Sequence, residues 1–303
     1  MSPTPTFLNM AHYLTRSLRV HGGRYRDAPV ILTVGDERRD PDLARKHPWM
    51  ADNGVEVRWV DQDLFARESF YATACERYRY EFRSDVVLAL DADTLIAGPL
   101  DELVEEAHRS GALCGVVAHV PPLARREQWQ AIYDSLDLGE LRTPCEHTGW
   151  GYMFQDESMR YCPPYFNLGV LAAPAGVMRS VGRDIYELMT AVDAVERTAY
   201  RVQIAVSLAV TRSSLPFRAL SFRWNFVNDP LLEALHAGEL GEVRIIHLLR
   251  RHQVNKDELF ASLDNVEAML ARTDLRVINE RAQKLLGEIH PQVRAEEAAR
   301  LTA

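Results

Sequence analysis

The chain alternates short apolar runs with longer segments in which apolar residues recur at helical spacing. The short apolar or alternating runs predict strands, and they lie at residues 29–35, 55–61, 86–91, 112–119, 166–173, 215–222 and 243–248. The helical spacing predicts helices at residues 8–20, 69–83, 99–109, 177–194, 199–212, 256–272 and from 279 onward. Residues 121–164 are rich in aromatic and turn residues and follow neither pattern.

Strands that alternate with helices indicate an α/β fold, with one mixed Rossmann-like sheet and helices on both faces. In such sheets ligands bind beyond the carboxyl ends of the strands. Asp91 and Asp93 follow one predicted strand, His247 lies at the end of another, and His119 at the end of a third. We therefore expect these side chains near the ligand crevice.

The composition is that of an ordinary globular protein, with 303 residues, 47% hydrophobic and 26% charged. The net charge of −8 argues against bulk attraction to nucleic acid or to an anionic membrane. The four cysteines lack metal-type spacing, which favours reduced thiols. No signal-like N-terminus and no apolar stretch of about 18 residues is found. We expect a cytoplasmic protein without a transmembrane segment.

Two carboxylates one residue apart close the buried strand in "VVLALDADTL". Such a pair often only caps a turn, and for an isolated "DAD" that interpretation is favoured. Here five apolar residues precede the acids, and a buried strand that runs into paired carboxylates needs a reason. A hard divalent cation removes their repulsion, and a nearby imidazole would complete a site that suits Mn²⁺ and tolerates Mg²⁺.

One enzyme class with such an opening is the haloacid-dehalogenase phosphatases. Their pattern places a threonine four residues after the first aspartate, whereas Thr94 stands three residues after Asp91. A convincing acidic pair downstream is also missing, and "GDERRD" lies upstream. A phosphatase of this type stays an alternative.

The segment "LALDADTLIAGPLDEL" closely resembles the DxD segment of metal-dependent GT-A glycosyltransferases. The likeness is greatest to the retaining family of glycogenin, bacterial lipopolysaccharide galactosyltransferases and galactinol synthase. Further segments are similar in the family's order, over roughly residues 65–256: "RESFYATACERYRYEF", "YFNLGVLAAPAG", "YRVQIAVSLAV", "LPFRALSFRWNFV" and "VRIIHLLRRHQVNK". Several motifs in one order are far more specific than a lone DxD.

The resemblance implies a role for each matching position. Asp91, Asp93 and His247 would ligate the metal, and Asp91 and Ala92 would also contact the donor. Arg77 would face the donor, Asn167 would contact its sugar, and Gln203 would bind the donor and act in catalysis. The implied site thus comprises Asp91, Ala92, Asp93, His247, Arg77, Asn167 and Gln203.

Three departures from the family pattern affect the donor site. Arg201 stands where the family usually has an aspartate, and Arg250 and Arg251 stand where a glycine is common. The family's "SLR" corresponds to residues 17–19, so too little chain precedes it for the strand that supplies the base-binding loop. Either the recorded start is late or the base pocket is incomplete.

Each candidate also has an ordinary structural interpretation. His247 could be a satisfied core histidine, Arg77 a solvated helix residue and Asn167 a turn residue. The amide of Gln203 lies in an apolar stretch and must find a partner. Four aromatic residues could stack on an acceptor sugar or simply fill a core: Trp129, Trp150, Tyr152 and Phe154. His119 is best explained as a strand terminus.

The sequence thus predicts a GT-A-like domain at residues 1–275 and a helical tail at 276–303 that docks or dimerises. The resemblance implies transfer of a hexose from a nucleoside diphosphate sugar, most simply a UDP-sugar, with Mn²⁺ or Mg²⁺ and with retention. The acceptor and the sugar are not predicted. A non-catalytic nucleotide-sugar-binding protein stays open beside the phosphatase.

Overall fold

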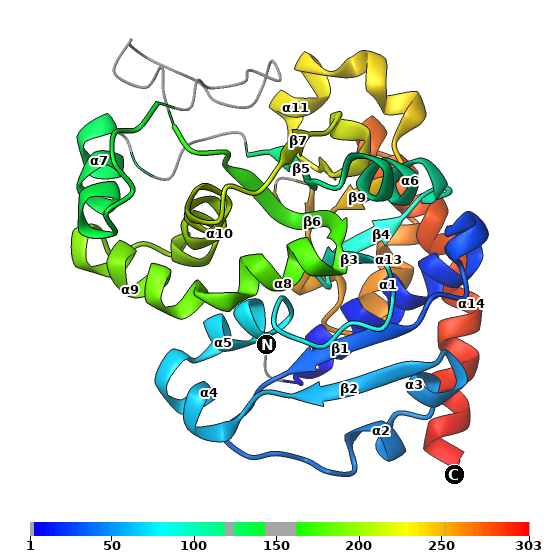
Figure 1. The fold of residues 1–303 in the computed structure, drawn as a ribbon. Helices are drawn as coiled ribbons and strands as arrows, with labels where there is room; N and C mark the ends of the chain where they lie inside the picture. The colour runs from blue at the N-terminus through cyan, green and yellow to red at the C-terminus, as the bar shows by residue number, and fades with distance from the viewer. Residues whose placement is uncertain (1–2, 119–122, 124, 143–161, 252, 303) are drawn as a thin grey trace. The chain divides into compact units, whose positions relative to one another are not determined.

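The structure is a computed structural model that describes the chain except residues 1–2, 119–122, 124, 143–161, 252 and 303. The side chains of residues 250–251 and 301–302 are also outside the described part. The chain divides into two compact units (Figure 1). Unit 1 comprises Met1–Thr73, Asp91–Glu102 and Phe222–Ala303, and unit 2 comprises Ala74–Leu90 and Leu103–Ser221.

Unit 1 contains three small sheets. Parallel strands β1 and β2 form one, the order β4-β9-β8 forms the second, and the antiparallel pair β10-β11 forms the third. The strands are β1 (Val30–Val34), β2 (Val55–Trp59), β4 (Thr94–Ile96), β8 (Phe226–Val227), β9 (Ile245–His247), β10 (Arg250–Arg251) and β11 (Val254–Asn255). In the second sheet β9 is central, antiparallel to β4 and parallel to β8.

The helices of unit 1 surround these sheets (Figure 1). They are α1 (Pro5–His21), η1 (Gly23–Tyr25), α2 (Leu43–Lys46), α3 (Trp49–Asp52), α4 (Gln62–Glu68), η3 (Phe222–Trp224), α11 (Pro230–Leu235), η4 (Ala237–Glu242), α12 (Lys256–Leu259), α13 (Leu263–Leu270) and α14 (Val277–Thr302). Helices α5 (Phe70–Glu76) and α6 (Asp101–Ser110) contain residues of both units.

Helix α1 shows how the sequence starts an element of the core. The hydroxyl of Thr4 accepts a hydrogen bond from the Phe7 amide, and a proline stands at the first turn, where its missing N–H costs nothing. The face with Phe7, Leu8 and Ala11 is buried in one apolar cluster with β1 and α3.

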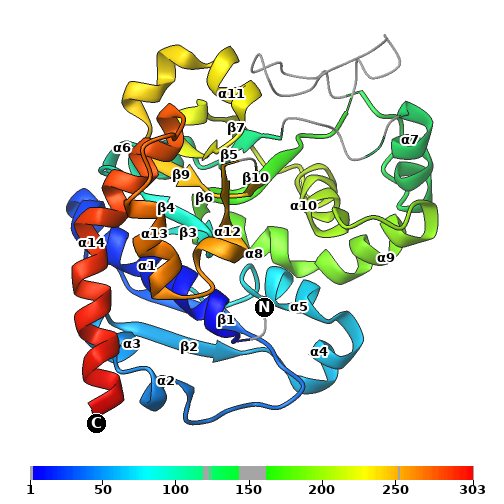
Figure 2. The same ribbon diagram turned by 180° about the vertical axis from the view of Figure 1, so that it is seen from behind.

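The C-terminal helix α14 packs along α1 and α13 (Figure 2). Its buried side chains include Leu286, Ile289 and Val293. Helix α14 is thus an integral part of unit 1. The boundary at residue 275 and a homodimer stay predictions.

Unit 2 is built on one four-stranded mixed sheet in the order β3-β6-β5-β7. Its strands are β3 (Val86–Leu90), β5 (Leu113–Val117), β6 (Phe166–Pro174) and β7 (Phe217–Ala219), and its helices are α7 (Arg126–Ser135), α8 (Ala175–Arg183), α9 (Ile185–Val195) and α10 (Arg201–Arg212). Strand β6 is antiparallel to β3 and β5, and β7 is parallel to β5. Every residue of β5 is buried, which explains its continuous apolar run.

The α/β class with mixed sheets and helices is confirmed. The described strands form separate sheets where the pattern indicated a single one, because the chain turns sharply at residues 91–94 and starts β4 in another sheet. Helix α7 lies in the segment for which no element was predicted. The helix expected at residues 177–194 is two helices, α8 and α9, separated at Asp184.

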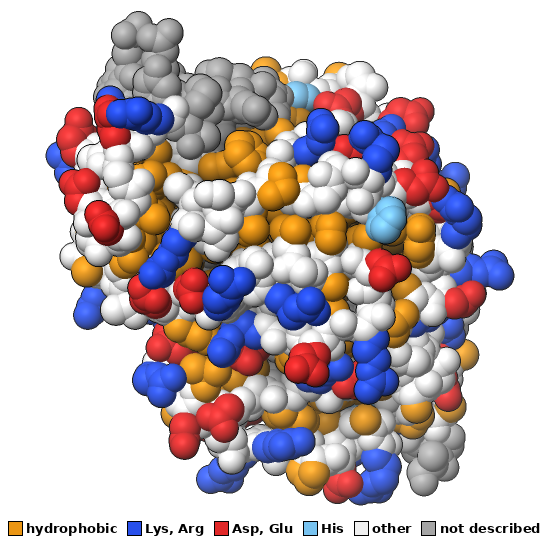
Figure 3. Space-filling model, viewed as in Figure 1, with side chains coloured by type: hydrophobic (Ala, Val, Ile, Leu, Met, Phe, Trp, Pro, Cys, Tyr) orange, Lys and Arg blue, Asp and Glu red, His pale blue; other side chains and the backbone are white. Residues whose placement is uncertain are grey.

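On the face in Figure 3, basic and acidic side chains of the described residues are interspersed. Cys75, Cys114 and Cys162 are buried thiols, and Cys145 lies outside the described residues. Among the helices that the structure describes, none has the length and apolar character needed to cross a bilayer.

Candidate active site

A tight turn follows β3 and places both aspartates. The backbone N–H and the hydroxyl of Thr94 both donate to the carbonyl of Asp91, at 3.1 and 2.7 Å, which closes a four-residue turn. Between the acids, the Ala92 side chain packs against the apolar cluster of α1, β1 and α3. The small apolar middle residue thus anchors the turn between the two carboxylates.

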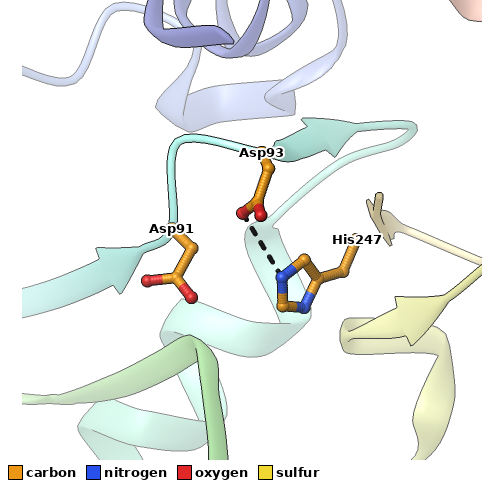
Figure 4. Close-up of side chains that lie close together, drawn as sticks. All are labelled: Asp91, Asp93 and His247. Carbon is orange, nitrogen blue, oxygen red and sulfur yellow. Dashed lines mark ion pairs between the residues drawn. The ribbon is translucent and has the colours of Figure 1, made fainter. Parts of the chain in front are cut away.

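The register of β4 against β9 brings His247 to this turn. Thr94 pairs with His247 across the two strands, and the Leu248 amide donates to the Asp93 carbonyl at 2.9 Å. One ligand atom from each of Asp91, Asp93 and His247 lies within 4.8 Å of the others. Figure 4 shows the three side chains turned toward one another. These three residues are called the metal cluster below.

Two members of the metal cluster are buried, and the third, Asp91, is partly exposed. Asp93 is 5% exposed and His247 is 4% exposed, and Nε2 of His247 lies 3.3 Å from Oδ1 of Asp93. The ammonium of Lys256, at the start of α12, forms an ion pair with Oδ2 of Asp93. Burial alone would raise the pKa of Asp93, but His247 and Lys256 lower it by more and hold it well below its usual range. Asp93 is therefore a carboxylate at neutral pH.

The donor set fits a divalent cation. Nδ1 of His247 lies 3.0 Å from Oδ1 of Asn225, and an amide oxygen can only accept, so the ring hydrogen is on Nδ1. In the neutral ring that ligates a metal, Nε2 would then present its lone pair on the side of Asp93. Oδ1 of Asp93 is buried and accepts no hydrogen bond from any described residue. A cation satisfies both atoms at once, and two carboxylates with one imidazole suit Mn²⁺ or Mg²⁺.

The structure gives Arg77 a backbone role within unit 2. Its two terminal nitrogens donate to the carbonyls of Leu90 and Leu168, at 3.3 and 3.2 Å, and the guanidinium lies 5.0 Å from the Tyr78 ring centre. Leu90 ends β3 and Leu168 lies in β6. The arginine therefore links two neighbouring strands, and its contact with a donor stays a prediction.

Asn167 and Gln203 also belong to unit 2, and their side chains differ in hydrogen bonding. Oδ1 of Asn167 accepts from the Gly169 amide at 2.9 Å, the local turn contact expected of an asparagine at the start of a strand. The partly buried side chain of Gln203, on α10, makes no hydrogen bond to the residues that the structure describes. The hydrogen-bond partner that this amide needs is thus not found in the described part of the chain.

Two further sequence interpretations can be compared with the structure. Arg201, which replaces the family's aspartate, forms an ion pair with Asp193 of α9. Trp129 is fully buried on α7, with its ring 6.2 Å from that of Tyr165, so its role is core packing. The remaining acceptor candidates lie outside the described residues, namely His119, Trp150, Tyr152 and Phe154.

Comparison with known proteins assigns the family. The Rhodobacterales glycosyltransferase domain matches residues 4–213. The chain belongs to this family. No curated protein matches this glycosyltransferase. Among solved structures, it is similar to an active-site mutant of LgtC, with TM-score 0.51 and 16% identity over 94% of this chain and 92% of that one. The apo form of glycosyltransferase GlyE from Streptococcus pneumoniae TIGR4 has TM-score 0.51 and 14% identity, over 93% of this chain and 62% of that one.

These similarities confirm a glycosyltransferase of the GT-A fold. At 14–16% identity the solved structures support the fold alone. The match to the family model identifies the enzyme class. The phosphatase alternative is thereby set aside.

Sequence reasoning did not single out two residues beside the metal cluster of this glycosyltransferase. Lys256 contacts Asp93 across 163 positions, and Asn225 contacts His247 across 22. Both lie in segments that resemble the family, "VRIIHLLRRHQVNK" and "LPFRALSFRWNFV". The resembling segments thus include both residues. Only the folded structure shows that Lys256 contacts Asp93 and that Asn225 contacts His247.

Proposed function

We propose that this glycosyltransferase transfers a hexose from a nucleoside diphosphate sugar, most simply a UDP-sugar, and depends on Mn²⁺ or Mg²⁺. The metal cluster is the observation that supports this proposal most directly. One ligand atom from each of Asp91, Asp93 and His247 lies within 4.8 Å of the others. Two carboxylates this close repel each other, and the Lys256 ammonium offsets part of that repulsion at Asp93. A site for a divalent cation accounts for their arrangement.

The chemistry of sugar transfer explains why such a cluster is useful. Negative charge grows on the leaving diphosphate as the sugar–phosphate bond breaks, and the anomeric carbon becomes oxocarbenium-like. A divalent cation would supply charge stabilisation to the diphosphate. Asp91, Asp93 and His247 would hold that cation, and the Lys256 ammonium adds a positive charge beside Asp93.

The donor sugar is assigned to Gln203 and Asn167. Gln203 supports this assignment because its amide makes no hydrogen bond to the described residues, so donor hydroxyls can use it. The similar LgtC structure is an active-site mutant in which a glutamine is replaced by glutamate, which makes an active-site glutamine reasonable here. Asn167 is assigned to the same sugar on the resemblance of "YFNLGVLAAPAG".

Retention of the anomeric configuration is proposed from the same resemblance. We assign no protein nucleophile, so front-face attack by the acceptor hydroxyl is the consistent scheme. Product made from a UDP-α-sugar should show the NMR coupling of an α linkage. A β coupling would contradict retention while leaving sugar transfer intact.

Calorimetry with UDP and a panel of UDP-sugars tests metal dependence. Binding should require Mn²⁺ or Mg²⁺ and should disappear in excess EDTA. Unchanged affinity in EDTA would remove metal from the proposal. Donor binding without either hydrolysis or transfer would support the non-catalytic alternative instead.

A further inference from the structure

Asn225 is a buried polar residue for which the reaction has no assigned role. It is 1% exposed and lies between η3 and β8. Its Oδ1 lies 3.0 Å from Nδ1 of His247, on the side of the ring opposite the nitrogen that faces Asp93. A buried amide placed behind a metal-ligand histidine can control what the front of the ring presents.

The hydrogen bond selects one form of the ring. A neutral imidazole carries its hydrogen on one nitrogen and a lone pair on the other. Because the amide oxygen only accepts, it holds the hydrogen on Nδ1 and leaves the lone pair on Nε2. That lone pair lies on the metal-cluster side, 3.3 Å from Oδ1 of Asp93. Without the amide oxygen, the ring could place its hydrogen on Nε2 or rotate.

An ordinary structural role for Asn225 is less consistent with the surrounding contacts. The backbone of His247 is already held on both sides, because β9 pairs with β4 and with β8. The backbone N–H of Asn228 also donates to the His247 carbonyl, at 3.2 Å. The strand therefore does not need the Asn225 side chain to place the histidine backbone. The contact of the amide oxygen with Nδ1 bears instead on the orientation and tautomer of the ring.

We propose that Asn225 is a positioning residue that keeps His247 as the Nδ1–H tautomer with Nε2 directed at the metal. This inference rests on the proposed metal-dependent function. Outer hydrogen-bond partners of ligating histidines fix the ring and raise its basicity, and their loss typically weakens metal binding about 10–100-fold.

Two variants distinguish the loss of the hydrogen bond to His247 from a change in the shape of the Asn225 side chain. Asn225→Leu removes the acceptor, and Asn225→Asp keeps it. We expect Asn225→Leu to bind Mn²⁺ about 10–100-fold more weakly, measured from the free Mn²⁺ signal by electron paramagnetic resonance. Asn225→Asp should bind Mn²⁺ at least as tightly as the wild type. Equal Mn²⁺ affinity in Asn225→Leu and the wild type would overturn the proposal, as would a tenfold or greater loss in Asn225→Asp.

A matched control comes from another buried asparagine of unit 1. Asn53 is 5% exposed and its amide donates to the Trp49 carbonyl at 2.8 Å. Asn53→Leu should lower the melting temperature without changing Mn²⁺ affinity. If it weakens Mn²⁺ binding as much as Asn225→Leu does, the effect reports general loss of packing and the positioning role is rejected.

The metal-free wild type provides a test that does not depend on function. The ¹⁵N shifts of His247, followed through a pH series until the ring is neutral, should show hydrogen on Nδ1. Hydrogen on Nε2 would overturn the inference even if Mn²⁺ binds. If the wild type binds no Mn²⁺ but shows the Nδ1–H tautomer, the metal part of the proposed function fails while the ring-holding contact is confirmed.

Discussion

The metal cluster of unit 1 and the proposed donor residues of unit 2 were identified from the same resemblance, yet their environments differ. In the cluster, Asn225 lies behind His247 and Lys256 contacts Asp93. In unit 2, Arg77 is bound to two strand carbonyls, whereas Gln203 makes no hydrogen bond to the described residues. A motif match thus locates a residue, but the contacts of its polar atoms indicate whether it can serve a ligand.

The largest effect is expected from the cluster itself. Asp93→Ala removes a buried ligand, so Mn²⁺-dependent UDP binding should be lost. Turnover should fall by about a thousandfold or more, equivalent to about 4 kcal/mol of transition-state stabilisation. Isothermal titration and initial rates measure the two effects. Asp101→Ala, which removes an acid of unit 1 that is paired with Arg24, is the control and should leave both unchanged. Normal turnover of Asp93→Ala would disprove the metal site.

The next largest effect on turnover is expected for a change at Gln203. Gln203→Ala should lower turnover by a factor on the order of ten to a thousand, the scale of one or two buried hydrogen bonds to donor hydroxyls. UDP alone should bind almost as before, because UDP lacks the sugar. Stability and both affinities are measured on the same variant. Equal losses for UDP and UDP-sugar, together with a lower melting temperature, would remove Gln203 from the sugar site.

Arg77 provides the contrasting case within unit 2. Arg77→Met keeps the length of the side chain but leaves the carbonyls of Leu90 and Leu168 without this donor. Unsatisfied buried acceptors typically cost about 1–3 kcal/mol, so the free energy of unfolding in urea should fall by about that amount. The UDP affinity of the same variant tests the predicted donor contact, since one tenfold step corresponds to about 1.4 kcal/mol of binding. A large loss of UDP affinity at unchanged stability would instead place Arg77 on the donor.

The smallest effect is expected for Lys256. Lys256→Met removes a cation that competes for Asp93, so Mn²⁺ alone should bind a few-fold more tightly, on the order of 1 kcal/mol for a screened charge. UDP binding to the Mn²⁺-loaded variant should weaken, because a positive charge near the diphosphate is lost. Lys284→Met, on α14, is a matched control that should change neither affinity. Weaker Mn²⁺ binding in Lys256→Met would show that the lysine mainly orients Asp93.

Much of the fold follows from local patterns. The runs at β1, β2, β3 and β6 were predicted close to their observed bounds, because apolar or alternating runs bounded by turn residues are typical of strands. Strand β4 was not predicted, since its three residues form a strand only through pairing with β9. Helix α7 was missed because aromatic and turn residues obscure its spacing, and its Trp129 is buried only by tertiary packing.

By itself, the sequence determined that two carboxylates follow an apolar strand and that a histidine ends another, because these facts depend on local order along the chain. Tertiary structure alone decided that Asp93 and His247 meet, since their contact depends on the register of β4 against β9. It also decided which groups stand behind them. Lys256 and Asn225 reach the cluster from distant positions, and a hydrogen bond or ion pair between such positions forms only when the intervening chain has folded.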